Sequence, residues 1–140
     1  MFDGGTLLAF SSDVVTFCEL NRADPFFGMQ VASTRVEPQL PLDPENYPVS
    51  TRPPESAKLA LSVQMKGYTV SAAKQPRWDD RLGSLQPGKL ANLCVRSANP
   101  FAVEPFQLKS IKFEPVTFEG TVISGGWGRI NGCGDNSSAG

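Results

Sequence analysis

The segment Leu82–Arg96, LGSLQPGKLANLCVR, constrains the fold most, because its character changes twice within a short stretch. Gly83 and the Pro87-Gly88 pair are typical of a chain that reverses after a helix. Pro87-Gly88 fits a turn with Pro at the second position and Gly at the position of positive φ. From Leu90 onward the residues are mostly apolar and β-compatible, which predicts a short, largely buried strand. The segment therefore predicts a boundary between helices and strands.

The residues after this boundary have the pattern of a small β module. Asn99-Pro100 ends the first strand, and Lys112–Phe118 with Thr121–Ser124 predicts a hairpin around the tight turn Glu119-Gly120. Residues 128–140 are rich in Gly, Ser and Asn, so we expect them to form a disordered tail.

The first half opens with a candidate strand at Thr6–Phe10, an apolar run of the kind buried on both faces in a parallel sheet. Asp13 follows the end of this strand. Barrel and doubly wound folds place their chemistry at the carboxyl ends of strands, so Asp13 is a candidate site residue. The alternative is an Asx-turn or a helix cap, which the local pattern alone favours.

Two helical regions are predicted between this strand and the boundary. Asp24-Pro25 has the pattern of an N-cap followed by Pro at the first helical position. Residues 37–54 contain six prolines and predict an extended loop. Glu55–Met65 has helical periodicity, Gly67 is expected to interrupt it, and a second short helix is expected to start at Tyr68-Thr69.

Charge and cysteine content exclude several classes of function. The chain has 140 residues and a formal net charge of -1, with 13 basic and 14 acidic residues, so it offers no footprint for nucleic acid or for an anionic membrane. The three cysteines show no C-x-x-C spacing, which fits a reducing, cytoplasmic compartment. No apolar run approaches the roughly 18 residues of a membrane span.

Four blocks of the sequence resemble, in order, motifs of the metal-dependent amidohydrolases, and in particular of their type-3, YtcJ-like members. The junction GSLQPGKLANLCV resembles the family's "GSL-x-PGK-x-ADLVV", with Asn92 in place of the family's Asp. The other three blocks are LLAFSSD (Leu7–Asp13, family "GSD"), DPFFGMQVASTR (Asp24–Arg35, family "DP-x-x-G-x-x-A-x-x-R") and KGYTVSAAK (Lys66–Lys74, family "YT-x-x-A").

The resemblance implies an α/β fold. Residues 1–81 would supply the last strand-helix unit of a TIM (β/α)8 barrel, and residues 82–127 would supply part of a small β-sandwich domain, followed by the 128–140 tail. The blocks match only the last third or so of a typical member. On this expectation the fold is incomplete as it stands, and a partner would be the missing N-terminal barrel portion.

The resemblance also implies the hydrolysis of carbon-nitrogen bonds other than peptide bonds in a small amide-type substrate. Asp13 matches the family's aspartate that binds a divalent metal, expected to be zinc, and that moves a proton from the metal-bound water to the departing nitrogen. Family members bind the metal mainly through histidines, whereas this chain has none. A catalytic zinc ordinarily takes three protein ligands. We therefore expect the chain alone to bind no metal tightly and to be inactive.

Other polar residues leave alternatives open. Arg35 and Arg52 could meet a substrate carboxylate or carbonyl, although such arginines are more often solvated or structural. Asp79 and Asp80 are adjacent in a predicted loop, which favours their interpretation as solvated turn residues over that as metal ligands. Two hypotheses remain: a C-terminal portion of an amidohydrolase, or a non-catalytic remnant that binds a partner through its β module.

Overall fold

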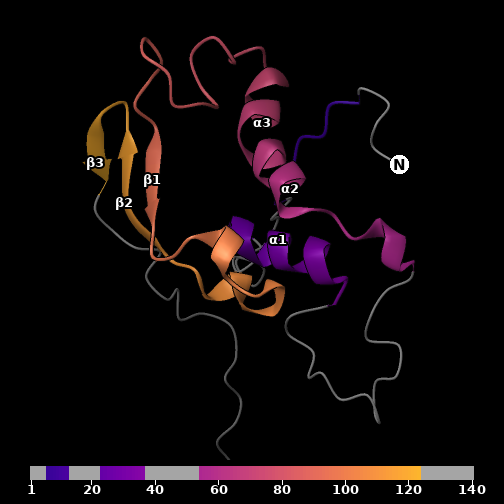
Figure 1. Cartoon of the computed structure of the whole chain (residues 1–140). Coiled ribbons are helices and arrows are strands. Elements are labelled where there is room, and N and C mark those ends of the chain that lie inside the picture. Colours follow the sequence, from indigo (N-terminus) through magenta and orange to yellow (C-terminus); the bar gives the residue numbers. More distant parts are fainter. Residues whose placement is uncertain (1–5, 13–22, 37–53, 124–140) are drawn as a thin grey trace, which may run out of the picture.

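A computed structural model describes residues 6–12, 23–36 and 54–123 of the chain (Figure 1). Its elements are α1 (Pro25–Thr34), η2 (Glu55–Ala57), α2 (Leu61–Tyr68), α3 (Val70–Lys74), β1 (Leu93–Arg96), η3 (Pro100–Ala102), η4 (Pro105–Ser110), β2 (Phe113–Phe118) and β3 (Thr121–Ile123). Four of our predictions concern residues outside the described ranges: Asp13, Arg52, nearly all of the proline-rich loop, and the 128–140 tail.

Helix α1 forms as its sequence predicts. Asp24 is the N-cap, and its Oδ1 accepts a hydrogen bond of 2.9 Å from the Phe26 N–H, which satisfies one of the otherwise unpaired donors of the first turn. Pro25 occupies the first turn, where its missing N–H costs nothing. The predicted helix start at Asp24-Pro25 is therefore confirmed.

The second helical region differs from the prediction in two places. The predicted helix over Glu55–Met65 is wrong in its first half, because η2 ends at Ala57 and the Leu59 N–H instead donates to the Ala32 carbonyl at 2.9 Å. The break expected at Gly67 lies at Thr69, whose φ of -122° and ψ of -94° are not helical. The Thr69 hydroxyl donates to the Met65 carbonyl at 2.7 Å, a local bond that competes with the helical ladder.

The hydrophobic core joins α1 to the turns of η4. Phe26 and Met29 of α1 are buried against Leu108 and Ile111, and the Phe26 ring stacks on Phe113 with centroids 5.2 Å apart. Figure 1 shows α1 crossing the η4 turns. The core thus contains residues from both sides of the predicted 81/82 boundary, and the domain division stays a prediction.

A turn and a lysine shape the junction between the helices and the sheet. Gly88 has a φ of +89°, and the Lys89 N–H donates to the Gln86 carbonyl at 3.2 Å, which confirms the predicted Pro87-Gly88 turn. Gly83 has a φ of +87°, and a Cβ there would lie 2.8 Å from the Ala73 Cβ of α3. Only glycine fits both the conformation and the space.

The three strands form an antiparallel sheet in the order β1-β2-β3. The predicted hairpin is confirmed: Phe118 pairs with Thr121, and the turn residues Glu119 and Gly120 have φ values of 50° and 81°, the pattern of a type I′ turn. Between Cys94 and Arg96 the register of β1 against β2 shifts, which marks a bulge.

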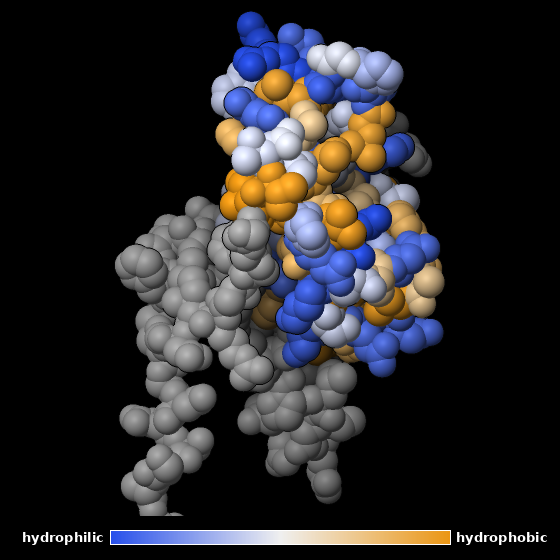
Figure 2. All heavy atoms as spheres, turned by 90° about the vertical axis from the view of Figure 1, so that its left-hand side faces the viewer, coloured by the Kyte–Doolittle hydropathy of each residue, from blue (hydrophilic) through white to orange (hydrophobic). Residues whose placement is uncertain are grey.

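The sheet is more exposed than its sequence predicts. Cross-strand partners share a face, so Cys94, Val116 and Ile123 lie on one face. Leu93, Thr117 and Val122 lie on the other. Apolar side chains reach solvent on both: Leu93 is 39% exposed, Val122 59% and Ile123 52%. Figure 2 turns this side toward the viewer and shows hydrophobic residues at the surface. The prediction of a largely buried β1, starting near Leu90, is therefore wrong.

The predicted strand at Thr6–Phe10 is also absent from the described structure. Residues 6–12 have no regular secondary structure, and Thr6 and Leu7 are exposed. A parallel strand needs a neighbouring strand to satisfy its backbone groups, and the described sheet contains only β1, β2 and β3. Within this segment, the Phe10 N–H instead donates to the Gly67 carbonyl at 3.2 Å. In the part of the chain that the structure describes, no helix is long and apolar enough to cross a membrane.

Candidate functional site

Arg35 ends α1 in a left-handed conformation with a φ of 65°, and its N–H donates to the Val31 carbonyl at 2.7 Å. A non-glycine residue in this region is uncommon and is held there by its neighbours. Arg35 lies between two buried residues, Thr34 and Val36. The Arg35 backbone therefore forms the C-cap that ends α1.

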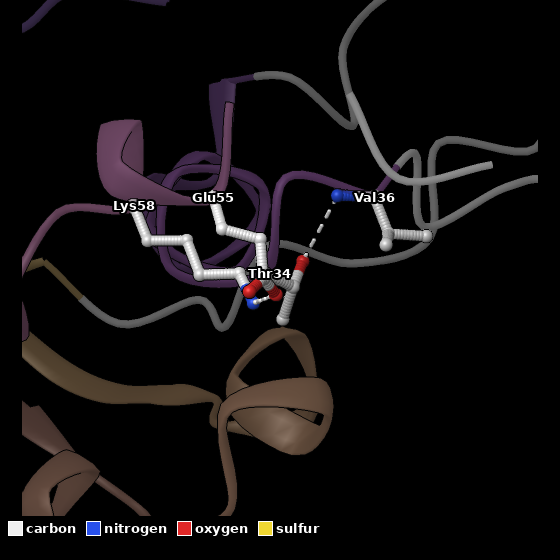
Figure 3. Close-up of polar contacts among 4 residues, drawn as sticks. All are labelled: Thr34, Val36, Glu55 and Lys58. Carbon is white, nitrogen blue, oxygen red and sulfur yellow. Dashed lines mark hydrogen bonds and ion pairs between the residues drawn. The ribbon is translucent and has the colours of Figure 1, made fainter. Parts of the chain in front are cut away.

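The Thr34 hydroxyl holds this helix end in place. It donates to the Gln30 carbonyl at 2.8 Å and accepts from the Val36 N–H at 3.2 Å, so it connects the two sides of Arg35 (Figure 3). Figure 3 also shows the exposed ion pair of Lys58 with Glu55, at 2.7 Å. This pair lowers the pKa of Glu55, through the hydrogen bond and then the charge of Lys58.

Tyr68 brings together three of the four sequence blocks. Its ring contacts the Phe10 ring, with centroids 5.4 Å apart and a tilt of 31°. Its hydroxyl lies against Gly28, where an added Cβ would overlap the oxygen. Phe10 comes from the block that leads to Asp13, and Gly28 from the block that starts at Asp24. Sequence reasoning missed this cluster, although the glycine four residues after Asp24 was a usable signal.

Two titratable groups of this cluster are perturbed. Burial raises the pKa of Asp24, while the Phe26 N–H and the charge of Lys112 act in the opposite direction. Burial also raises the pKa of Tyr68, and the negative charge of Asp24 adds to the effect. Both groups therefore favour their neutral forms more than exposed side chains do. Perturbed pairs of this kind occur at functional sites and also in purely structural networks.

Lys89, the lysine of the junction, has a structural role. Lys89 Nζ donates to the Asp79 carbonyl at 2.5 Å, to Ser84 Oγ at 2.8 Å and to the Leu82 carbonyl at 3.3 Å. These bonds tie the strand side of the junction to the end of the helical half. The side chains of Asp79 and Asp80 are exposed in a turn, which confirms their interpretation as turn residues.

Asn92 also bonds across the sheet region. Its Oδ1 accepts from the Glu119 N–H at 2.7 Å, so the side chain caps the β2-β3 turn. This role requires an acceptor oxygen but no negative charge.

A complete metal centre does not fit the described residues. They contain no group of three His, Cys, Asp or Glu side chains that could hold a metal ion. The whole sequence contains no histidine. Because a catalytic zinc ordinarily needs three protein ligands, we derive no catalytic step through a metal from this chain. Asp13, the predicted metal ligand and catalytic residue, lies outside the described residues.

A comparison of the chain with known protein families identifies the family to which it belongs. The model of the amidohydrolase family matches residues 1–125, which is nearly the whole chain. This chain is a member of the amidohydrolase family. The resemblance inferred from the motifs is confirmed at this level, and with it the assignment to a hydrolase family. No curated protein and no solved structure matches the chain significantly.

Family membership gives the described elements a context. Amidohydrolases are usually built on a TIM barrel and usually bind a divalent metal. This member contributes helices and a small three-stranded antiparallel sheet in its described residues. The cluster around Tyr68 and the Lys89 junction both lie within the residues that match the family.

Proposed function

We propose that this chain is the C-terminal portion of a metal-dependent amidohydrolase of the type-3, YtcJ-like kind, which hydrolyses carbon-nitrogen bonds other than peptide bonds. The family match over residues 1–125 carries the proposal. The order of the four motif blocks supports the C-terminal assignment, since these blocks belong to the last third of a typical member. The fold of the complete enzyme would be a barrel with a small β-sandwich domain.

Asp13 is the residue of this chain that we assign to the chemistry. Its carboxylate would accept a proton from the attacking water and return it to the departing nitrogen as the carbon-nitrogen bond breaks. A divalent metal, expected to be zinc, would need most of its ligands from another polypeptide segment, because this chain has no histidine. The partner implied is therefore the N-terminal barrel portion, and the substrate is a small amide-type molecule.

The chain alone should have no activity. We expect the purified 140-residue protein, supplied with Zn²⁺ and a chromogenic anilide as probe, to show no hydrolysis above the buffer rate. Metal-dependent turnover that copurifies with the chain and disappears in Asp13→Ala would contradict this.

The enzyme proposal is tested by fusion. The reading frame upstream of this chain should encode a His-x-His motif after an apolar strand, and its product fused to this chain should hydrolyse amide-type substrates. Asp13→Asn, which keeps the size but loses the base, should reduce turnover at least about 10²-fold. Near-normal turnover in Asp13→Asn would refute the catalytic assignment. Absence of any such upstream frame would favour the alternative, a non-catalytic remnant whose β module binds a partner.

Arg35 is our proposal for substrate binding. In the fused enzyme, Arg35→Ala should raise KM for a substrate that carries a carboxylate or carbonyl. Arg77 is a matched control, because it is also an arginine at positive φ, with a φ of 62°. Equal effects of Arg35→Ala and Arg77→Ala on KM would show that Arg35 has only its helix-ending role.

A further inference from the structure

The Phe10 clamp, defined as Phe10, Gly67 and Tyr68, joins the start of the described chain to helix α2. It contains one backbone hydrogen bond, from the Phe10 N–H to the Gly67 carbonyl at 3.2 Å, and one ring contact, between Phe10 and Tyr68 at 5.4 Å. The two contacts hold the same residue from its backbone and from its side chain. Phe10 is thereby fixed relative to the end of α2.

Gly67 explains why the ring can approach the helix. A Cβ on Gly67 would overlap the edge of the Phe10 ring. Glycine inside a helix costs about 0.5–1 kcal/mol relative to alanine, so its presence within α2 calls for a compensating role. Gly67 is also buried. The close approach of Phe10 supplies that role, since alanine would push the ring away.

The break at Thr69 explains why the Gly67 carbonyl is available. The last carbonyls of a helix have no partner within the helix and need one from elsewhere. Helix α2 ends at Tyr68, and the Thr69 N–H bonds to the Lys66 carbonyl at 3.2 Å, so the Gly67 carbonyl is free to accept from Phe10. Because of the same break, Tyr68 is the last residue of α2.

Tyr68 extends the clamp to helix α1. Its hydroxyl lies against Gly28, one turn beyond the N-cap Asp24, and an added Cβ on Gly28 would overlap that hydroxyl. Each of the two aromatic side chains therefore packs against a glycine. The Phe10 ring lies against Gly67, and the Tyr68 hydroxyl lies against Gly28. Replacing either glycine by a larger residue would therefore force a ring of the clamp to move.

We infer that Gly67 and Tyr68 are positioning residues: they fix the path of residues 6–12, which lead directly to Asp13. Packing of α2 alone would not need a glycine at position 67, whereas the Phe10 ring occupies the space that a Cβ there would fill. The contacts of the clamp are independent of the proposed function. Only the proposed role of these residues in positioning Asp13 for catalysis rests on that function.

The test is amide hydrogen exchange of the full chain, measured by NMR without substrate or metal, so that its outcome is independent of any hydrolase activity. Gly67→Ala should speed exchange at the Phe10 amide by at least about fivefold, the scale of one lost hydrogen bond. Amides in the first part of α2, such as that of Gln64, should not exchange faster, because alanine favours the helix.

Matched variants separate the clamp from general destabilisation. Tyr68→Phe keeps the ring, so exchange at Phe10 should stay within about twofold of the unmodified chain, whereas Tyr68→Ala should speed it at least about fivefold. In a Phe10→Ala background the steric conflict is gone, so adding Gly67→Ala should stabilise the chain. If Gly67→Ala does not fold, folding of the double variant supports the clamp.

Three results would overturn the inference. The first is unchanged exchange at Phe10 in Gly67→Ala. The second is the same stabilisation by Gly67→Ala with and without the Phe10 ring. The third is a double variant that fails to fold together with the single one.

Discussion

The core around α1 and η4 and the three-stranded sheet are held together by contacts of different range. In the core, the Lys109 N–H donates to Gln30 Oε1 at 3.0 Å across 79 positions of sequence, and Phe26 stacks on Phe113. In the sheet, β2 and β3 pair through a two-residue turn, and most of the side chains are exposed. The first region is stabilised by burial, and the second by turn geometry and backbone pairing.

This difference separates two sources of stability. Burial of a large apolar side chain contributes about 1.5–3 kcal/mol, whereas a hydrogen bond contributes about 0.5–1.5 kcal/mol net. Leu108 and Ile111 are each 1% exposed, so the core has the larger contribution per residue. The sheet depends on turn residues that can be recognised in the sequence. The core depends on contacts between residues far apart in the chain, which cannot be recognised from a local pattern.

The largest expected effect is in the core. Leu108→Ala should lower the free energy of unfolding by about 2–5 kcal/mol, because it leaves a cavity at a fully buried position. The matched control is Leu93→Ala in β1, where the side chain is 39% exposed and the loss should stay below about 1 kcal/mol. Urea denaturation of both variants measures the difference. Equal losses of unfolding free energy in the two variants would contradict the proposed difference in stability between the core and the sheet.

The junction between the regions should show an intermediate effect. Lys89→Met removes three hydrogen bonds to partly exposed acceptors and should lower the free energy of unfolding by about 1–3 kcal/mol. Lys58→Met is the control, since the ion pair that Lys58 forms with Glu55 in the described part of the chain is exposed, and no measurable change is expected. A Lys89 variant as stable as the Lys58 variant would show that the junction needs only its turn.

A gain in stability is expected in the sheet. Glu119 has a φ of 50°, which costs a residue with a Cβ some stability, while asparagine tolerates this conformation. Glu119→Asn should therefore raise the free energy of unfolding by about 1 kcal/mol or less. Glu114→Asn, at an exposed strand position, should give no gain. Thermal unfolding of the two variants distinguishes turn geometry from a general effect of removing a charge.

The smallest effect is a pH dependence on the helical side of the molecule. The pKa of Tyr68 is raised in the folded chain, so between the unfolded value near 10.0 and the higher folded value the native state holds more protons. Stability from this group is thus complete below pH 10 and falls as the pH rises through the folded pKa. Tyr68→Phe should reduce this alkaline loss, as measured by urea unfolding at several pH values above 9. An identical alkaline loss in both proteins would argue against the buried phenol.

Local signals in the sequence predict several elements correctly. Asp24-Pro25 starts α1, Pro87-Gly88 forms its turn, and Glu119-Gly120 forms the hairpin turn. Each of these depends on the conformational preference of one or two residues. The motif blocks also predict the family, which the match over residues 1–125 confirms.

The remaining features depend on contacts that a local pattern does not contain. Gly67 was expected to break the helix, whereas it lies inside α2 and accommodates the Phe10 ring. The strand expected at Thr6–Phe10 has no pairing partner among the described strands. Burial of η4 against α1 joins positions about eighty residues apart, beyond any periodicity. Of the predicted site, the structure describes Arg35, and Asp13 stays a prediction.

Native-state hydrogen exchange of the unmodified chain tests the contrast between the two regions most directly. Amides that bond within the core, such as that of Lys109, should exchange only through global unfolding and be the slowest. Amides of β3, whose three residues are all exposed, should exchange through smaller local openings at least about tenfold faster. The same slow rate in the core and in the sheet would contradict the account, because it would mean that burial and local pairing stabilise one cooperative unit equally.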